Sequence, residues 1–134
     1  MHALMESRTL SVSIGCDHKE VYEFASNPEN LPKWAKSFCI SVKKSGNLWI
    51  AETPSGPVKI EFVERNAFGV MDHCVIVSGT KIFNAMRVLR NAKGSEMLFT
   101  VFRQPGIEDK KYNEDIGLIE TDLAKLKAIM ESRN

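Results

Sequence analysis

The sequence predicts an α+β fold in which a curved antiparallel sheet of six to seven strands wraps around one long C-terminal helix, with two short helices after the first strand. A strand-like alternation opens the chain, short strands with turns about ten residues apart fill its middle, and a helical apolar repeat closes it. One helix cannot cover both faces of a sheet. We therefore expect the sheet to curve around the helix, to bury its concave face and to leave a cavity between the two.

Length and charge restrict the class of protein. The 134 residues have the size of one domain, and no linker, repeat or low-complexity segment divides them, so we expect a single domain over 1–134. Lys plus Arg number 18 and Asp plus Glu 17, which leaves no overall charge that would attract nucleic acid or acidic membranes.

Neither a targeting segment nor a metal motif is found. The stretch MHALMESRTL lacks a basic segment followed by an apolar core, and no apolar run reaches the roughly 18 residues of a membrane span, so a cytoplasmic protein without membrane insertion is expected. The histidines are too scattered for a metal site, and no cofactor is expected. Three cysteines at wide spacing are expected to be buried free thiols: Cys16, Cys39 and Cys74.

The first part of the chain predicts one strand and two short helices. Residues 7–14 alternate between apolar and polar side chains, which indicates a half-buried strand. Asp17 and Glu20 have the spacing of a capping box at the start of the first helix. Asn27 followed by Pro28 predicts the cap and the first residue of the second helix.

Six further strands are expected before the long helix. Each segment alternates or is mostly apolar, and clusters of Gly, Pro, Asn or Ser separate them. The expected strands are 38–42, 48–53, 58–64, 70–77, 82–90 and 95–103.

The chain after residue 106 has the period of a helix. Some 25 residues at about 1.5 Å per residue make a rod of roughly 37 Å, which is long enough to cross a whole sheet. Apolar residues recur at steps of three and four and form one stripe that should face the sheet: Tyr112, Ile116, Ile119, Leu123, Leu126 and Met130.

An adjacent Asp and His interrupt the apolar segment FGVMDHCVIV, residues 68–77. Neighbours in a regular strand point to opposite faces, so Asp72 and His73 cannot form a catalytic pair with each other unless a bulge turns one of them. Periodicity does not decide which of them faces the cavity, but the higher cost of burying a carboxylate favours His73 inside. His73 is then a core histidine, a ligand contact or a catalytic group, and these interpretations stay open.

The stretch SVSIGCDHKEVYEFASNPENLPKWA resembles the start of the START-like, polyketide cyclase/dehydrase superfamily (SRPBCC). There a first strand leads to a helix of the pattern V-[WY]-x-F-x-x-x-P-x-N-x-x-x-W. The stretches MRVLRNAKGSEMLFTVFRQPG and DIGLIETDLAKLKAIME resemble small, mostly uncharacterised bacterial members. The resemblance covers nearly the whole chain and implies the helix-grip fold. It implies no single activity, because the superfamily includes lipid carriers, hormone receptors, allergens, cyclases and chaperone cofactors. The matching pattern residues are Val21, Tyr22, Phe24, Pro28, Asn30 and Trp34.

Candidate ligand contacts are polar or large residues on rows expected to face inward. Asn84 shares an apolar row, and a buried amide needs partners that either the sheet or a ligand can supply. Tyr112 opens the stripe of the long helix, with its ring expected inside the mouth of the cavity and its hydroxyl toward a polar group. No residue is assigned a catalytic or metal-binding role. The candidate ligand-binding residues are His73, Asn84, Tyr112, Trp34, Trp49, Met86, Phe62 and Phe99.

We therefore expect a binding module, a carrier or sensor, that holds a small and mostly apolar molecule between sheet and helix. One alternative is a cyclase- or dehydratase-type enzyme acting on a polyketide-like or other hydrophobic substrate, which is disfavoured because no acid/base pair falls on one face. Another is a protein-interaction or chaperone-cofactor module that uses the convex face. The ligand and the oligomeric state, a homodimer included, stay open.

Overall fold

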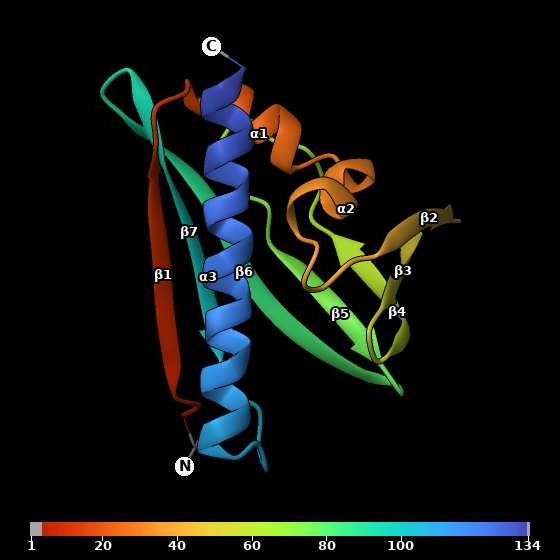
Figure 1. The fold of residues 1–134 in the computed structure, drawn as a ribbon. Helices are drawn as coiled ribbons and strands as arrows, with labels where there is room; N and C mark the ends of the chain where they lie inside the picture. The colour runs from red at the N-terminus through yellow and green to blue at the C-terminus, as the bar shows by residue number, and fades with distance from the viewer. Residues whose placement is uncertain (1–3, 134) are drawn as a thin grey trace.

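A computed structural model describes residues 4–133, and in this part of the chain one seven-stranded antiparallel sheet curves around one side of a long helix (Figure 1). The helices are α1 (His18–Ala25), the 3₁₀ turn Pro28–Asn30, α2 (Leu31–Trp34) and α3 (Asp109–Ser132). The strands are β1 (Ser7–Ile14), β2 (Ser41–Ser45), β3 (Leu48–Thr53), β4 (Gly56–Phe62), β5 (His73–Val77), β6 (Thr80–Asn91) and β7 (Gly94–Phe102).

The order of the strands in the sheet is β1-β7-β6-β5-β4-β3-β2. The long strand β6 pairs with β5 through Thr80–Asn84 and with β7 through Ala85–Asn91, so the two halves of the sheet meet at its middle. Figure 1 shows α3 lying along the inside of the curve, with α1 and α2 covering the end of the concave face near the C-terminus of α3. The expected α+β architecture is confirmed.

The apolar stripe of α3 forms the centre of the core. Five of its six residues are buried and Ile119 is half-buried. Leu123, Leu126 and Met130 join the main hydrophobic cluster with α1, α2 and the sheet. Toward the start of α3, Tyr112 and Ile116 form a smaller cluster with Val101 of β7.

Side chains cap the short helices as the sequence suggests, with one difference. Asp17 accepts a hydrogen bond from the backbone N–H of Lys19 at 3.3 Å. Glu20 accepts from the Cys16 thiol at 3.5 Å instead of closing a capping box. Asn27 accepts from the N–H of Glu29 at 3.1 Å and so caps the 3₁₀ turn that follows the end of α1.

Two strands begin three residues later than expected, whereas the others begin within two residues of their expected start. The strand expected at 38–42 is shifted to Ser41–Ser45, because the N–H groups of Phe38 and Cys39 both donate to the Ala35 carbonyl and prolong the turn after α2. The strand expected at 70–77 is regular only from His73, and Val70 forms an isolated bridge.

A turn held by side chains leads into this irregular segment. The side chain of Asn66 accepts from the N–H groups of Phe68 and Val70 and donates to the carbonyls of Glu64 and Val70. At Gly69 the φ is +71°, and a Cβ there would lie 2.3 Å from the Val88 carbonyl oxygen. Only glycine therefore lets the chain approach β6 at this point.

All three cysteines are free thiols, and Cys74 is only partly buried. Burial raises the pKa of the Cys39 thiol to about 11. Within residues 4–133, no helix is long and apolar enough to cross a membrane, and no three His, Cys, Asp or Glu side chains are grouped so that they could hold a metal ion.

Candidate ligand-binding site

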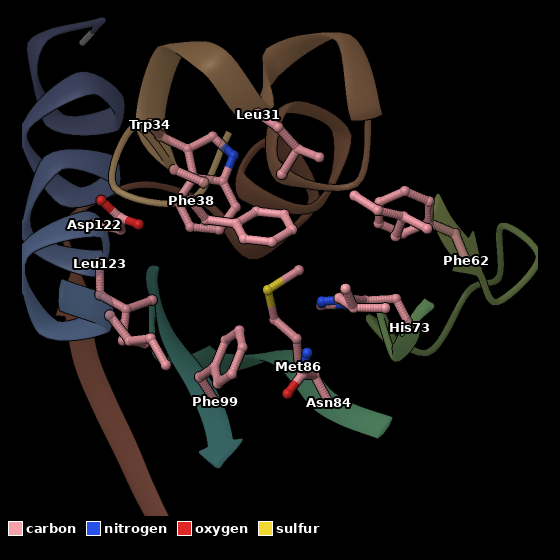
Figure 2. Close-up of a pocket in the computed structure, with 14 residues that line it drawn as sticks. Leu31, Trp34, Phe38, Phe62, His73, Asn84, Met86, Phe99, Asp122 and Leu123 are labelled. Atoms are coloured by element: carbon pink, nitrogen blue, oxygen red, sulfur yellow. The ribbon is translucent and has the colours of Figure 1, made fainter. Parts of the chain in front are cut away.

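A cavity of about 140 Å³ lies between α3, the segment after α2 and the strands β4 to β7. Figure 2 shows the aromatic side chains of Trp34, Phe38, Phe62 and Phe99 around it, together with Met86 of β6. Three of the lining residues are polar, and they come from β5, β6 and α3. The lining residues are Leu31, Trp34, Ala35, Phe38, Ile60, Phe62, His73, Val75, Asn84, Met86, Phe99, Ile119, Asp122 and Leu123.

His73 stands between two phenylalanine rings in the cavity wall. Its ring centroid lies 5.4 Å from that of Phe62 and 6.1 Å from that of Phe99, the second in an edge-to-face arrangement. Figure 2 shows a ring nitrogen of His73 pointing into the cavity. This wall is therefore aromatic, with one polar position in it.

Asp72 and His73 together replace one backbone hydrogen bond between β6 and the start of β5. The N–H of Met71 donates to the Met86 carbonyl at 2.7 Å, as in an ordinary antiparallel pair. The reciprocal bond is absent, because the N–H of Met86 donates to Asp72 Oδ1 at 2.9 Å and His73 Nδ1 lies 3.1 Å from the Met71 carbonyl oxygen. The pairing register is the same on both sides of this point. The adjacent acid and imidazole thus satisfy two backbone groups that the ladder leaves open.

This contact fixes the tautomer of His73. A carbonyl oxygen only accepts, so Nδ1 must carry the hydrogen that it donates to Met71. Burial lowers the pKa of His73 below its ordinary value of 6.5, against the opposing effects of the Met71 bond and the Asp72 charge. The ring is therefore neutral near pH 7, and its Nε2 has a lone pair that can only accept a hydrogen bond.

Asp122 of α3 lines the opposite wall of the cavity and was missed among the candidates. Its residue is 7% exposed, and its Oδ1 accepts from the N–H of Ser37 at 3.2 Å. Burial raises its pKa, although the hydrogen bonds from Ser37 act against this effect. A signal was present in the sequence, since Asp122 lies three residues after Ile119 and four before Leu126, within the apolar stripe.

Comparison with solved structures shows the fold. An uncharacterised protein of Bacillus thuringiensis is similar over 93% of this chain and 98% of its own, with a TM-score of 0.78 and 16% identity. The Aha1 dimer from Colwellia psychrerythraea gives a TM-score of 0.76 at 11% identity, over 95% of this chain and 97% of its own. DynU16, a protein of the dynemicin biosynthetic locus, gives 0.74 at 13% identity over 96% of this chain and 48% of its own. The chain has the helix-grip fold. No protein-family model matches it, and no curated protein has a similar sequence.

The helix-grip fold brings six of the eight sequence candidates to one cavity. They are His73, Asn84, Trp34, Met86, Phe62 and Phe99. Asn84 is the register partner of His73, so their side chains are neighbours on the concave face. No hydrogen bond of the Asn84 amide is found among residues 4–133. An amide and an imidazole acceptor therefore stand side by side in an apolar cavity.

The other two candidates lie outside the cavity. The hydroxyl of Tyr112 donates to the Val101 carbonyl at 3.0 Å, and its ring belongs to the smaller cluster at the start of α3. Trp49 packs half-buried against the main core from β3. Neither residue is therefore included in the site proposed below. Spacing along a helix or strand shows which face a side chain occupies, but not how far along that face the cavity extends.

Asp122→Asn is expected to stabilise the protein by about 1 kcal/mol at neutral pH, a rise in Tm of about 4 °C. An acid whose pKa is higher in the folded state favours folding while protonated and loses that contribution as the pH rises through its folded-state pKa. Asn keeps an oxygen for the Ser37 N–H and carries no charge. The gain should therefore disappear below the ordinary pKa of 3.8, where both forms of the chain are uncharged at this position.

Thermal melts at about pH 3 and about pH 7.5 test whether the gain in stability is present at neutral pH and absent at low pH. Glu120→Gln, an exposed position on the same helix, is the matched control and should change little at either pH. A lower Tm of Asp122→Asn at neutral pH would contradict the interpretation and indicate that the carboxylate contributes favourably to the fold.

Proposed function

We propose that the protein is a carrier or sensor that binds a small, mostly apolar molecule in the cavity between α3 and the sheet. The observation that carries the proposal is the cavity itself, about 140 Å³ in volume and lined mainly by apolar and aromatic side chains. Cavities of this kind with a few convergent polar groups are the usual sites of small ligands.

The volume limits the size of the ligand. An engineered apolar cavity of about 150 Å³ holds one benzene molecule, whereas sites for drug-sized ligands have about 300–1,000 Å³. The present cavity therefore suits a molecule with a single six-membered ring. A long acyl chain or a fused-ring polyketide would require Met86 or Phe38 to move.

An enzyme remains the second candidate, on one specific observation. The Nε2 lone pair of His73 and the carboxyl group of Asp122 line the same cavity from opposite walls. The sequence disfavoured an enzyme because it showed no acid and base on one face of a strand. Two titratable groups on opposite walls of one cavity remove part of that argument. Asp72 takes no part in such a pair, because its carboxylate is bonded to the Met86 N–H and to Arg87.

Binding of fluorobenzene, followed by ¹⁹F NMR and calorimetric titration, tests the proposed function. We expect saturable binding to the unmodified protein and its loss in Val75→Phe, where the larger side chain fills the cavity. Val77→Phe is the matched control, since Val77 lies two residues further along the same strand, is 39% exposed and does not line the cavity. Circular dichroism shows that each variant is folded. Absence of saturable binding of fluorobenzene and of other neutral single-ring probes to the unmodified protein, or equal binding to folded Val75→Phe, would contradict the proposal.

A further inference from the structure

The polar groups of the cavity favour a ligand group that can both donate and accept a hydrogen bond. His73 Nε2 can only accept, because Nδ1–H is committed to the Met71 carbonyl. The neighbouring Asn84 amide has both a donor and an acceptor, and the structure of residues 4–133 shows no protein partner for either. A ligand without polar atoms would leave both side chains without hydrogen bonds, which is costly in an apolar surrounding.

Resting on the proposed function, we propose that the ligand is a neutral single-ring aromatic alcohol of the phenol class. Its hydroxyl donates to His73 Nε2 and accepts from Asn84 Nδ2, while its ring packs against Phe62, Phe99 and Met86. A hydroxyl group is matched to this pair because it donates one hydrogen bond and accepts another at the same atom.

Charge and size exclude the close relatives of such a ligand. A carboxylate would meet a neutral imidazole and the Asp122 carboxyl group, with no cation among the lining residues to balance its charge. An ether such as anisole offers no donor to Nε2. A second fused ring would have to fit into a cavity of about 140 Å³, which is close to the volume that holds one benzene molecule.

The experiment compares three probes that each have one fluorinated ring: 4-fluorophenol, fluorobenzene and 4-fluorobenzoate. Titration by ¹⁹F NMR near pH 7 should show 4-fluorophenol binding about 10-fold more tightly than fluorobenzene, as expected for two hydrogen bonds of ordinary strength. 4-Fluorobenzoate should show no saturable binding.

Two variants test the two hydrogen bonds. His73→Phe keeps an aromatic ring of similar shape without nitrogen atoms, and Asn84→Leu keeps the shape of the amide without its polar atoms. Each should weaken 4-fluorophenol binding by about 3- to 10-fold and leave fluorobenzene binding unchanged or tighter. Phe83→Leu is the control, because Phe83 is the neighbour of Asn84 on β6 but points to the convex face and is 46% exposed.

Each outcome has a distinct meaning. Equal affinity for 4-fluorophenol and fluorobenzene overturns the assignment of a hydroxyl-bearing ligand and leaves the proposed function standing. Absence of binding by both neutral probes overturns the proposed function as well. His73→Phe also loses the bond to Met71, so if that variant does not fold, Asn84→Leu decides: an unchanged preference for 4-fluorophenol in that variant contradicts the proposal.

Discussion

Replacing Leu126 by Ala is expected to lower the free energy of unfolding by about 2–5 kcal/mol. Leu126 is 0% exposed and belongs to the main cluster, where α3 meets α1, α2 and the sheet. Truncation removes buried methyl groups and leaves a void that this densely packed part of the core can refill only in part. Chemical denaturation followed by tryptophan fluorescence measures the change.

Leu118→Ala is the matched control for this prediction. It makes the same chemical change on the same helix, but Leu118 is 47% exposed and faces away from the sheet. Its expected effect is below about 0.5 kcal/mol. Similar losses in the two variants would mean that α3 does not bury one defined face.

Asp72→Ala is expected to lower the free energy of unfolding by about 1–3 kcal/mol. The variant leaves the buried N–H of Met86 without an acceptor at the point where β5 and β6 meet. Asp72→Asn retains an oxygen at that position and should recover most of the loss. Chemical denaturation of both variants measures the difference.

The ion pair of Asp72 with Arg87 needs its own control. Arg87 Nη2 lies 3.0 Å from Asp72 Oδ2, but the arginine side chain is 51% exposed, so the pair should contribute no more than about 1 kcal/mol. Arg87→Gln isolates this contribution, since it leaves the Met86 bond intact. If Arg87→Gln costs as much as Asp72→Ala, the effect of Asp72 comes from the charge pair and the account of the replaced ladder bond is wrong.

The sequence predicts the fold well where local pattern and packing agree. The six apolar residues of the α3 stripe are periodic over about five turns, and the strands after Gly46 are separated by strong turn residues, so each element could be recognised without knowledge of its neighbours. The shift of β2 was not predictable in this way. Residues 38–40 alternate like a strand, but the N–H groups of Phe38 and Cys39 donate to the Ala35 carbonyl, a contact that depends on how α2 ends.

Six of the eight candidate residues from the sequence line the cavity, but the sequence did not predict how far the cavity extends. The higher cost of burying a carboxylate favoured His73 on the inner face, and the structure places it in the cavity wall. The role of Asp72, the residue before His73, depends on its hydrogen bond from the N–H of Met86. Met86 is fourteen residues away along the chain, so no local sequence pattern indicates that contact. Asp122 was overlooked because an acid within an apolar stripe looks like an exception, although its 3–4 spacing marks it as facing inward.

The position of β1 in the sheet has a consequence for the order of folding. β1 is the first strand of the chain but pairs with the last one, with Ser7 opposite Phe102, whereas β2 to β7 each pair with a strand adjacent in sequence. On a ribosome the N-terminal strand emerges first and has to wait, without its ladder, until nearly the whole domain has been synthesised. Closing so long a loop is entropically costly and slow compared with forming the hairpins. We therefore expect the meander to assemble first. β1 and α3, which are joined by the bond from Lys127 to the Ser13 carbonyl, should dock in the late step that completes the native core.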